Sequence, residues 1–274
     1  MTLASDWNGE TGERWVRNQE DLDAWLRPIG ALAIERLGDV SGRTVLDVGC
    51  GCGATLIDLA EAVGPTGSVL GIDVSRSMVE RARARVTHLP AVEVVLGDAQ
   101  KYDFGARRFD AVMSRFGVMF FDDTVAGLGH LASFLAPGGL MSFVCWQGLE
   151  HNEWASVPIA VANEILGPPE PKPPGEPGPF RFADDAEMRA TLERAGLVDV
   201  RIDGVVDSRP AGDVEHVVEV FGRQVGPVSR RIHDVDDELR HAVLGSLRTT
   251  LTARAVDGMV AFSTAVWCVT ARSR

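Results

Sequence analysis

Short apolar runs and helical patterns alternate along the first half of the chain. Runs that are apolar almost throughout are typical of parallel strands buried on both faces, while apolar residues three or four apart are typical of helices packed by one face. The predicted strands lie over residues 45–48, 68–74, 92–99, 109–114 and 135–146. Their alternation with helical patterns indicates an open, mostly parallel sheet that is covered by helices.

The helices around these strands carry their own signals. Residues 54–62 and 123–135 predict helices, and Asp122 or Asp123 is the expected N-cap of the second. Helical spacing also predicts N-terminal helices, which we expect to cover the sheet edge near a ligand, from Trp15, Leu22, Trp25, Leu26 and Ile29.

The second half adds strands and helices around an irregular segment. Residues 167–179 are so rich in proline and glycine that no regular element is expected there. The other predicted elements are helices over 152–166 and 185–195, strands over 198–205 and 259–270, and two helices within 211–257.

These elements predict a single α/β domain, a doubly wound sheet of seven strands whose last strand is antiparallel. Its expected parts are an N-terminal helical cap (1–38), a core (39–151), an inserted lid (152–183), more core (184–210), a helical insertion (211–257) and the closing strand (258–274). A lid is one interpretation of residues 152–183, because insertions after core strands often build binding sites. A plain exposed loop is the other interpretation.

Composition excludes several classes of protein. The net charge of −12 at pH 7 disfavours a nucleic-acid partner, which would need a basic surface. Arg81, Arg83 and Arg85 form one dense basic run, which we interpret as the solvated face of a helix. The chain shows neither a secretory leader nor an apolar run of 18 residues. We therefore expect a cytoplasmic protein that does not span a membrane, and a homodimer is compatible with the sequence.

The cysteines point to no metal site. Cys50 and Cys52 lack the second pair of ligands that a zinc site needs, so no metal is expected. Reduced, buried thiols in or beside strands are expected for all four: Cys50, Cys52, Cys145 and Cys268.

A glycine-rich turn follows the first strand at once. Gly49, Gly51 and Gly53 lie between that strand and a helix, the arrangement of a nucleotide-binding turn. A dinucleotide fingerprint reads G-x-G-x-x-G, whereas this turn reads D-x-G-x-G-x-G and begins with Asp47. A carboxylate there would repel a pyrophosphate and favour a cationic or hydroxyl-bearing ligand. Asp73 follows about 20 residues later, where a carboxylate can bind ribose hydroxyls.

These segments resemble the class I S-adenosylmethionine-dependent methyltransferases. The turn matches their first motif, and the strands that end near Asp73, Asp98 and Ser114 follow in the family's order. Residues 114–121, together with Trp7–Gly9 and Gly12–Trp15, are similar to the subgroup of ubiquinone, menaquinone and bacterial natural-product methyltransferases. The resemblance covers about half of the chain and implies the family's seven-stranded Rossmann-like fold.

The resemblance implies a set of cofactor contacts. Asp47 and the loop 49–53, Cys50 included, would hold the methionine end of S-adenosylmethionine, and Asp73 would bind its ribose. Trp15 and Gln19 would close over the methionine tail, although packing of their own helix is the favoured alternative for Trp15. The adenine and sulfonium contacts would come from Val74, Met78, Gly97, Asp98, Ala99, Ser114, Arg115 and Phe116.

The same resemblance implies methyl transfer to a small molecule, with oxygen favoured over carbon or nitrogen. The main task is to place a nucleophile in line with an activated methyl group. His151 is the candidate general base, because its ordinary pKa suits proton transfer, and a structural role is the alternative. Arg115 is a second catalytic candidate, with a structural ion pair as its alternative. His130 is expected to pack or face solvent, while His216, His233 and His241 are candidates for the acceptor pocket.

The expected acceptor is apolar or aromatic, because aromatic and Met side chains collect in the segments that would surround it. The candidates are Met119, Phe120, Trp146, Trp154, Phe180 and Phe221, with Phe116 and Phe182 beside them, and each is also a plausible core residue. Two other functions remain open from the sequence. Asp73 would also bind the ribose of an NAD(P)-dependent oxidoreductase, although the glycine spacing and the closing strand count against that function. A protein that binds S-adenosylmethionine without transferring its methyl group would carry the same loop.

Overall fold

The computed structural model of the protein describes residues 6–171, 173 and 175–274. Its contacts divide the chain into two compact units. Unit 1 comprises Met1–Trp146, Glu176–Val205 and Val266–Arg274, and unit 2 comprises Gln147–Gly175 and Val206–Ala265. The expected single domain, with its cap, lid and insertion, stays a prediction. None of the described helices is long and apolar enough to cross a membrane.

The sheet has seven strands in the order β3-β2-β1-β4-β5-β7-β6. β1 to β5 pair in parallel, and β7 pairs antiparallel to β5, which confirms the predicted Rossmann-like fold class. The strands are β1 (Thr44–Val48), β2 (Ser68–Asp73), β3 (Val92–Leu96), β4 (Phe109–Arg115), β5 (Leu135–Trp146), β6 (Val198–Asp213) and β7 (Met259–Arg272).

β1 lies at the centre of unit 1 and explains why its sequence is so apolar. Leu46 pairs with Leu70 of β2 on one side and Val112 of β4 on the other. Leu46, Ile72 and Met113 are fully buried. The one charged residue of this strand, Asp47, pairs with Gly71 and Met113 and is itself fully buried, so a carboxylate is enclosed where the sheet is otherwise apolar.

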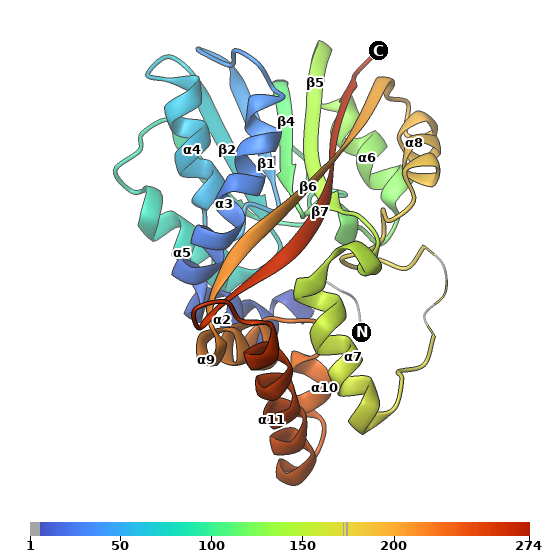
Figure 1. Ribbon diagram of the computed structural model, residues 1–274. Coiled ribbons are helices and arrows are strands. Elements are labelled where there is room, and N and C mark those ends of the chain that lie inside the picture. The colour runs from blue at the N-terminus through green and yellow to red at the C-terminus, as the bar shows by residue number, and fades with distance from the viewer. Residues whose placement is uncertain (1–5, 172, 174) are drawn as a thin grey trace. The chain divides into compact units, whose positions relative to one another are not determined.

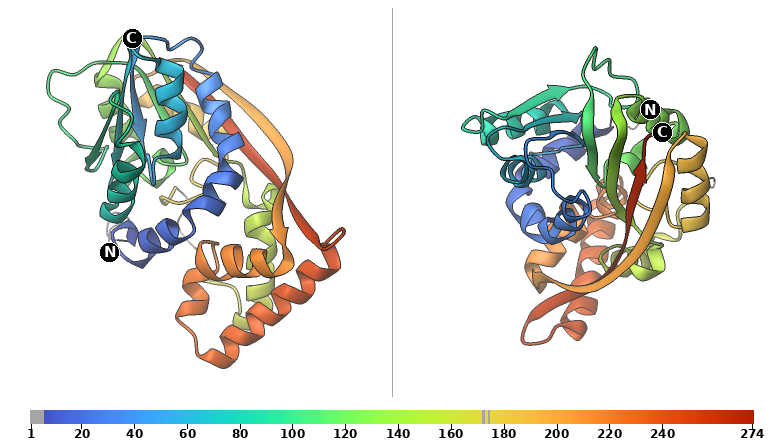
Figure 2. Two further views of the ribbon diagram at one scale, coloured as in Figure 1. Left: turned by 90° about the vertical axis from the view of Figure 1, so that its left-hand side faces the viewer. Right: turned by 90° about the horizontal axis from the view of Figure 1, so that it is seen from above.

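Helices cover both faces of the sheet in unit 1 (Figures 1 and 2). One face carries α3 (Gln19–Glu35), α4 (Ala54–Val63) and α5 (Arg76–Val86), and the other carries α6 (Thr124–Ser133) and α8 (Asp185–Arg194). Asp123 is the N-cap of α6, as predicted, because its carboxylate accepts a hydrogen bond from the backbone N–H of Ala126 at 2.9 Å.

The N-terminal periodicity produces two helices that meet at Asn18. The first is α2 (Glu10–Arg17), which packs on α5, and the second is α3, which packs on β4 and β5 rather than at an outer strand. Leu22, Leu26 and Ile29 form the buried stripe of α3, which confirms the predicted helical face.

The predicted bounds were wrong in two places. β3 ends at Leu96, so Asp98 lies in the following loop and not in the strand. β6 continues to Asp213 instead of ending at 205, because an edge strand tolerates polar residues and Pro210 on its unpaired side. The number of helices also differs from the prediction, because residues 214–254 hold more than two. They are α9 (Val214–Val217), the π-helix η3 (Val218–Gln224), α10 (Ser229–His233) and α11 (Asp237–Arg254).

Unit 2 has its own small core. Ala162 of α7 (Glu153–Leu166), Val228, Ile232 of α10 and Val243 of α11 form a buried cluster. The predicted helix over 152–166 is thus confirmed as α7. Residues 167–179 form no helix or strand where the structure describes them, as their proline content predicts.

Candidate active site

The glycine loop between β1 and α4 has the tight geometry that its sequence predicts. Gly49 and Gly53 adopt φ values of +71° and +87°, which residues with a Cβ rarely adopt. A Cβ on Gly49 would stand 2.9 Å from the Cα of Gly117, so the loop touches the turn that follows β4. The segments that follow β1 and β4 are therefore in direct contact at the carboxyl ends of these two strands.

Asp47 is fully buried immediately before this loop. One carboxylate oxygen accepts a hydrogen bond from the Thr55 hydroxyl at 2.5 Å, while Oδ1 has no hydrogen-bond partner. Burial raises the pKa of Asp47 from 3.8 to about 7, and the Thr55 bond and the Arg115 charge oppose that rise. A buried acceptor with an open lone pair costs free energy until a donor reaches it.

Arg115, at the end of β4, brings a half-buried cation to the same place. A Cβ on Gly30 of α3 would lie 3.0 Å from its Cδ and 3.5 Å from Thr55, so the side chain runs between α3 and α4. Burial lowers the pKa of Arg115, and the carboxylates of Asp23 and Asp47 oppose this effect. Its Nη1 has no hydrogen-bond partner. Asp47 Oδ1 is thus an acceptor without a donor, Arg115 Nη1 is a donor without an acceptor, and both atoms are shielded from solvent near the glycine loop.

Asp73 fixes the loop from the end of β2. Its two oxygens accept hydrogen bonds from the backbone N–H groups of Gly51 and Ser75, each at 2.8 Å. Burial raises the pKa of Asp73, and these backbone bonds oppose the rise. Each oxygen keeps a second lone pair that a hydroxyl group is able to reach. The predicted ribose-binding residue is therefore also a structural brace of the loop.

The loops that follow β2 and β3 hold the predicted adenine contacts. Met78 and Ala99 are buried. Asp98 lies 3.2 Å from Lys101 and accepts the backbone N–H of Gln100 at 3.0 Å. A Cβ on Gly97 would stand 2.4 Å from the Tyr102 ring, so a glycine is required there.

Asn8 holds the N-terminal segment against this loop region. It donates to the carbonyl of Val74 at 2.7 Å and accepts from the backbone N–H of Arg76 at 3.0 Å. Gly12 allows α2 to approach closely, since a Cβ there would lie 2.6 Å from the Ser75 hydroxyl.

The turn after β4 is braced and strained. The Ser114 hydroxyl donates to the Val48 carbonyl at 2.8 Å and accepts from the Gly117 N–H at 3.1 Å. Phe116 has a φ of +63°, an uncommon conformation for a bulky residue, and its ring stacks on Trp146 with centroids 4.2 Å apart and planes at 12°. Trp25 covers Trp146 at 6.0 Å. Trp146 thus contacts two aromatic rings.

A second aromatic group joins the N-terminal segment to this turn. Trp7 packs edge-on against Trp15 at 5.7 Å and against Phe120 at 5.3 Å. Met119 is buried, and its carbonyl accepts the N–H of Gly178 at 3.0 Å. Two of the predicted acceptor contacts, Met119 and Phe120, therefore lie beside the turn after β4. A third, Phe180, is half-buried in the segment before α8.

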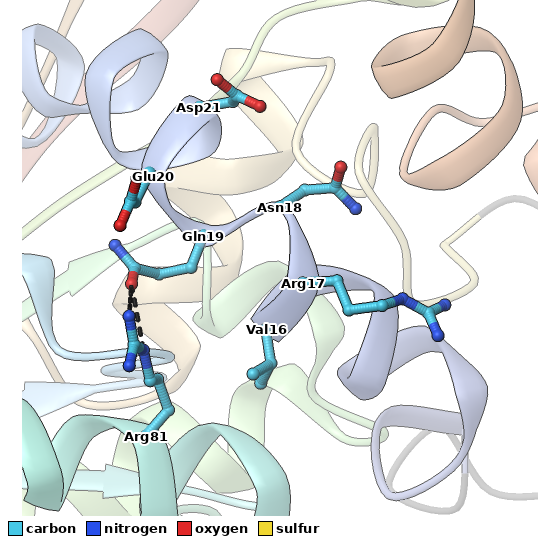
Figure 3. Close-up of a pocket in the computed structure, with 7 residues that line it drawn as sticks. All are labelled: Val16, Arg17, Asn18, Gln19, Glu20, Asp21 and Arg81. Atoms are coloured by element: carbon cyan, nitrogen blue, oxygen red, sulfur yellow. Dashed lines mark hydrogen bonds between the residues drawn. The ribbon is translucent and has the colours of Figure 1, made fainter.

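Figure 3 shows a hollow of about 170 Å³ at the junction of α2 and α3, where Gln19 and Arg81 face each other. The Gln19 amide oxygen accepts from Arg81 Nε and Nη2 at 3.1 and 2.9 Å. The interpretation of the three α5 arginines as a solvated face is confirmed for Arg81 and Arg83, which are exposed, whereas Arg85 is half-buried. Arg83 donates twice to the Val94 carbonyl, and Arg85 donates to the Cys52 carbonyl at 2.7 Å, so each has a tertiary partner.

Other predicted residues belong to unit 2 or to a core. His151 is largely exposed and lies 3.5 Å from Glu150, and both line a hollow of about 320 Å³. Trp154 is buried, and Phe221, on the π-helix η3, packs on Phe262 at 5.8 Å. Phe182 is a core residue of unit 1 that contacts Phe143 at 5.9 Å. The tie of His130 to the Tyr102 carbonyl at 2.9 Å confirms its packing role.

Sequence reasoning missed Trp7, Asn8, Gly30, Thr55 and Gly117 as parts of the site. Thr55 was detectable, because position eight after Asp47 falls in the first turn of the helix that follows the loop. Trp7 and Asn8 were noted only as a family resemblance. Gly30 carries no signal in the sequence, since its importance depends on the side chain of Arg115 that passes it.

The segment that builds this site is also found in known proteins. A family model described as a methyltransferase domain matches residues 45–139, which contain the glycine loop, Asp73, Asp98 and Arg115. Nocamycin O-methyltransferase of Saccharothrix syringae is 31% identical over 91% of this chain and 92% of its own length. The chain belongs to the class I S-adenosylmethionine-dependent methyltransferases.

Other relatives place this methyltransferase among enzymes of small molecules. Aklanonic acid methyltransferase DauC of Streptomyces sp. (strain C5) is 40% identical over 43% of this chain and 55% of its own length, so the match spans little more than half of that relative. Demethylmenaquinone methyltransferase of Staphylococcus aureus (strain JH9) is 31% identical over 61% of this chain and 72% of its own length. The YcgJ protein of Bacillus subtilis shares the fold, with a TM-score of 0.59, 16% identity, and coverage of 90% and 99%.

The methyltransferase uses S-adenosylmethionine and acts on a small molecule. This membership removes the NAD(P)-dependent oxidoreductase and the binding protein without methyl transfer as alternatives. The residues present fit the cofactor. An amino acid offers an ammonium donor and a carboxylate acceptor, and the enclosed oxygen of Asp47 and the enclosed nitrogen of Arg115 are their complements.

Proposed function

We propose that this methyltransferase transfers a methyl group to an oxygen of a small, apolar or aromatic molecule by in-line displacement. The observation that carries the choice of oxygen is the match over nine-tenths of the chain to a relative named as an O-methyltransferase. The aromatic groups around Phe116 and Trp7 support an apolar acceptor, because rings enclose planar and apolar molecules well.

The cofactor end of the proposal rests on unit 1 alone. Asp47 would accept from the ammonium of the methionine end, and Arg115 would donate to its carboxylate. Asp73 would hold the ribose, while Met78, Asp98 and Ala99 would surround the adenine. When bound, S-adenosylmethionine supplies a methyl group that its sulfonium already activates. The protein's own part is to place the acceptor, to exclude water and to hold the charges.

The strained turn of Phe116 gives the site a rigid wall. The backbone of Phe116 is held at positive φ while its ring is stacked on Trp146 and the next residue, Gly117, touches Gly49. A wall fixed by packing on one side and by the glycine loop on the other keeps the acceptor from drifting out of line.

We infer that the acceptor oxygen is acidic, as in a carboxylic acid, an enol or a phenol. Such an oxygen ionises without strong help from a protein base. Among the described residues of unit 1, His130 is packed between Phe104 and Phe134 and is bonded to Tyr102, and His88 is exposed. Neither histidine stands at the turn of Phe116. The name of a second relative gives an acid as its substrate.

A base at His151 is the competing proposal. Glu150 at 3.5 Å is able to orient the imidazole, and the hollow that both residues line is large enough for part of a small molecule. An aliphatic alcohol as acceptor would require such a base. The two proposals therefore differ in the acidity of the oxygen that is methylated.

The test is a transfer assay with tritiated S-adenosylmethionine and matched acceptors. Aromatic carboxylic acids, phenols and benzylic alcohols of the same carbon skeleton are compared, and the methylated atom is identified by mass spectrometry and NMR. Labelled methyl esters or phenol ethers support an acidic oxygen. Transfer to the alcohols alone favours a base, and a methyl group on nitrogen or carbon overturns O-methylation.

A further inference from the structure

A continuous row of polar contacts connects α3 to the glycine loop. Arg81 donates to the amide oxygen of Gln19, and the amide nitrogen of Gln19 donates to Asp23 one turn later. Asp23 also pairs with Arg85 Nη2 at 2.8 Å, and Nη1 of the same arginine donates to the carbonyl of Cys52 at 2.7 Å. The row begins at the hollow in Figure 3 and ends inside the loop.

Arg81, at the outer end of this row, is exposed, and the other three side chains are largely shielded from water. Gln19 is 5% exposed, and the side chains of Asp23 and Arg85 are 18% and 21% exposed. Hydrogen bonds between charged groups in such surroundings are stronger and more directional than on the surface. Arg85 is therefore held in one orientation by Asp23 while it holds the Cys52 carbonyl.

The position of Cys52 gives the bond its importance. The peptide between Cys52 and Gly53 is fixed from both ends, because its carbonyl accepts from Arg85 and its N–H donates to the Cys50 carbonyl at 2.9 Å. Gly53 is the N-cap of α4 and lies in the left-handed region. Rotation of this peptide would change the direction of the first free N–H groups of α4, which are the donors that a helix offers to an anionic group.

We propose that Arg85 is a positioning residue for the cofactor, and that Asp23 and Gln19 hold it in place. It does not touch the ligand but sets the direction of the loop peptide that does. The inference rests on the proposed placement of the cofactor at residues 49–53. It also ties α3 to the loop, so disorder in α3 lowers cofactor affinity through this row of contacts.

The same helix provides a matched control. Arg83 lies two residues away on α5 and, like Arg85, donates to a backbone carbonyl, that of Val94, through Nε and Nη2 at 3.0 and 2.9 Å. Val94 belongs to β3 and not to the loop. Arg83→Gln and Arg85→Gln thus each remove a positive charge and an arginine-to-carbonyl bond from the same helix, and Arg85→Gln also removes the ion pair with Asp23.

The experiment measures binding of S-adenosylmethionine and S-adenosylhomocysteine to the full chain by calorimetry, with melting temperatures recorded in parallel. We expect Arg85→Gln to weaken both ligands alike, by about 5- to 50-fold, and Arg83→Gln to leave both unchanged. Asp23→Asn, which keeps the side-chain volume, should weaken both ligands in the same direction. The double variant should bind no more weakly than Arg85→Gln alone, because both changes break one row.

The two ligands separate positioning from charge. The sulfonium is cationic and the homocysteine thioether is neutral, so loss of a nearby positive charge alone would favour S-adenosylmethionine relative to S-adenosylhomocysteine. Opposite effects on the two ligands would overturn the positioning role, as would equal effects of Arg83→Gln and Arg85→Gln. If the wild-type chain bound neither ligand, the cofactor placement itself would fail, a result distinct from failure of Arg85.

Discussion

Asp47 of unit 1 and Asn152 of unit 2 are two fully buried polar side chains with opposite hydrogen-bond states. Asn152 donates to the carbonyls of Gln147, Gly148 and Ala265 at 3.0 to 3.2 Å and accepts from the N–H of Ala265 at 3.0 Å. Asp47 has one bond, from Thr55, and an open oxygen. A saturated buried group stabilises a fold, whereas an unsaturated one costs stability and marks a place where a ligand completes the bonding.

The region of Asn152 shows what a saturated site is for. The strand pairing of β5 with β7 ends at Trp146 and Val266. Past that point the Gln147 N–H still donates to the Ala265 carbonyl at 3.0 Å, and the Asn152 side chain and the Glu153 carboxylate add further bonds. They bond Ala265 and the N–H of Ser263, the latter at 2.8 Å. Two side chains thus continue the bonding of a strand that has ended. This role is structural, and it predicts no direct effect on a ligand.

The largest expected effect is therefore on stability and lies in unit 2. Asn152→Ala should lower the free energy of unfolding by about 2–4 kcal/mol, because it leaves buried backbone groups without partners. Urea titration measures this loss, and Asn163→Ala, in the same unit with one bond to Arg231, is the control. The folded variant should bind S-adenosylhomocysteine as the wild type does. A weaker ligand affinity without loss of stability would contradict the contrast with Asp47.

Asp73→Ala should act in the reverse manner. The variant loses the carboxylate that holds Gly51 and Ser75 and that we expect to bind ribose hydroxyls, so its affinity for S-adenosylhomocysteine should fall by about 1.5–3 kcal/mol. Titration calorimetry gives this value directly. An unchanged affinity would remove Asp73 from the cofactor site and leave it as a brace of the loop.

The open oxygen of Asp47 also predicts how stability depends on pH. Burial raises the pKa of Asp47 to about 7 in the free protein. The folded chain therefore keeps a proton that the unfolded chain releases near pH 4. The proton held by Asp47 therefore raises the free energy of unfolding. This gain is complete below about pH 4 and is lost as the pH rises through about 7.

Asp47→Asn removes this titration. At pH 8 the cofactor-free variant should be more stable than the wild type by about 1–3 kcal/mol, and the difference should vanish toward pH 4. Thermal unfolding across this range measures it. A wild type that is the more stable protein at pH 8 would mean that Asp47 is not a strained, unsatisfied group.

The smallest expected effect concerns His151. If the acceptor oxygen is acidic, His151→Ala should change kcat by less than about threefold, whereas loss of a general base usually costs about 10²–10⁴-fold. Cofactor affinity should not change in either case. Initial rates at saturating acceptor distinguish the outcomes, and a loss of about 100-fold or more in kcat with unchanged cofactor affinity would establish the base.

The difference between the two regions also explains what the sequence revealed. The strand, loop and helix around Asp47 were predictable, because a buried strand is continuously apolar and glycine spacing is fixed by backbone geometry. The same reasoning located Asp73 and the α6 cap. These are local rules, and they hold wherever neighbours in sequence build the feature.

The sequence did not reveal features that depend on distant partners. The Arg85 bond to Cys52 needs residues 33 apart, and Asn152 reaches Ala265 across 113 positions. β6 extends beyond its apolar residues because of its place at the sheet edge, and the π-helix η3 has no signature of its own. The positive φ of Phe116 is set by its stack on Trp146 and by the Gly117 contact, neither of which a pattern of residues shows.

The most direct test of the account is the affinity for S-adenosylhomocysteine as a function of pH, measured by calorimetry for the wild type and for Asp47→Asn. An ammonium group at the open oxygen favours the ionised carboxylate, so the wild-type affinity should rise by up to about tenfold per pH unit below about pH 7 and level off above it. Asp47→Asn should bind weakly and show no such rise. A wild-type affinity that is flat from pH 5.5 to 8.5, or a variant that binds equally well, would contradict the claim that Asp47 binds the cofactor's amino group.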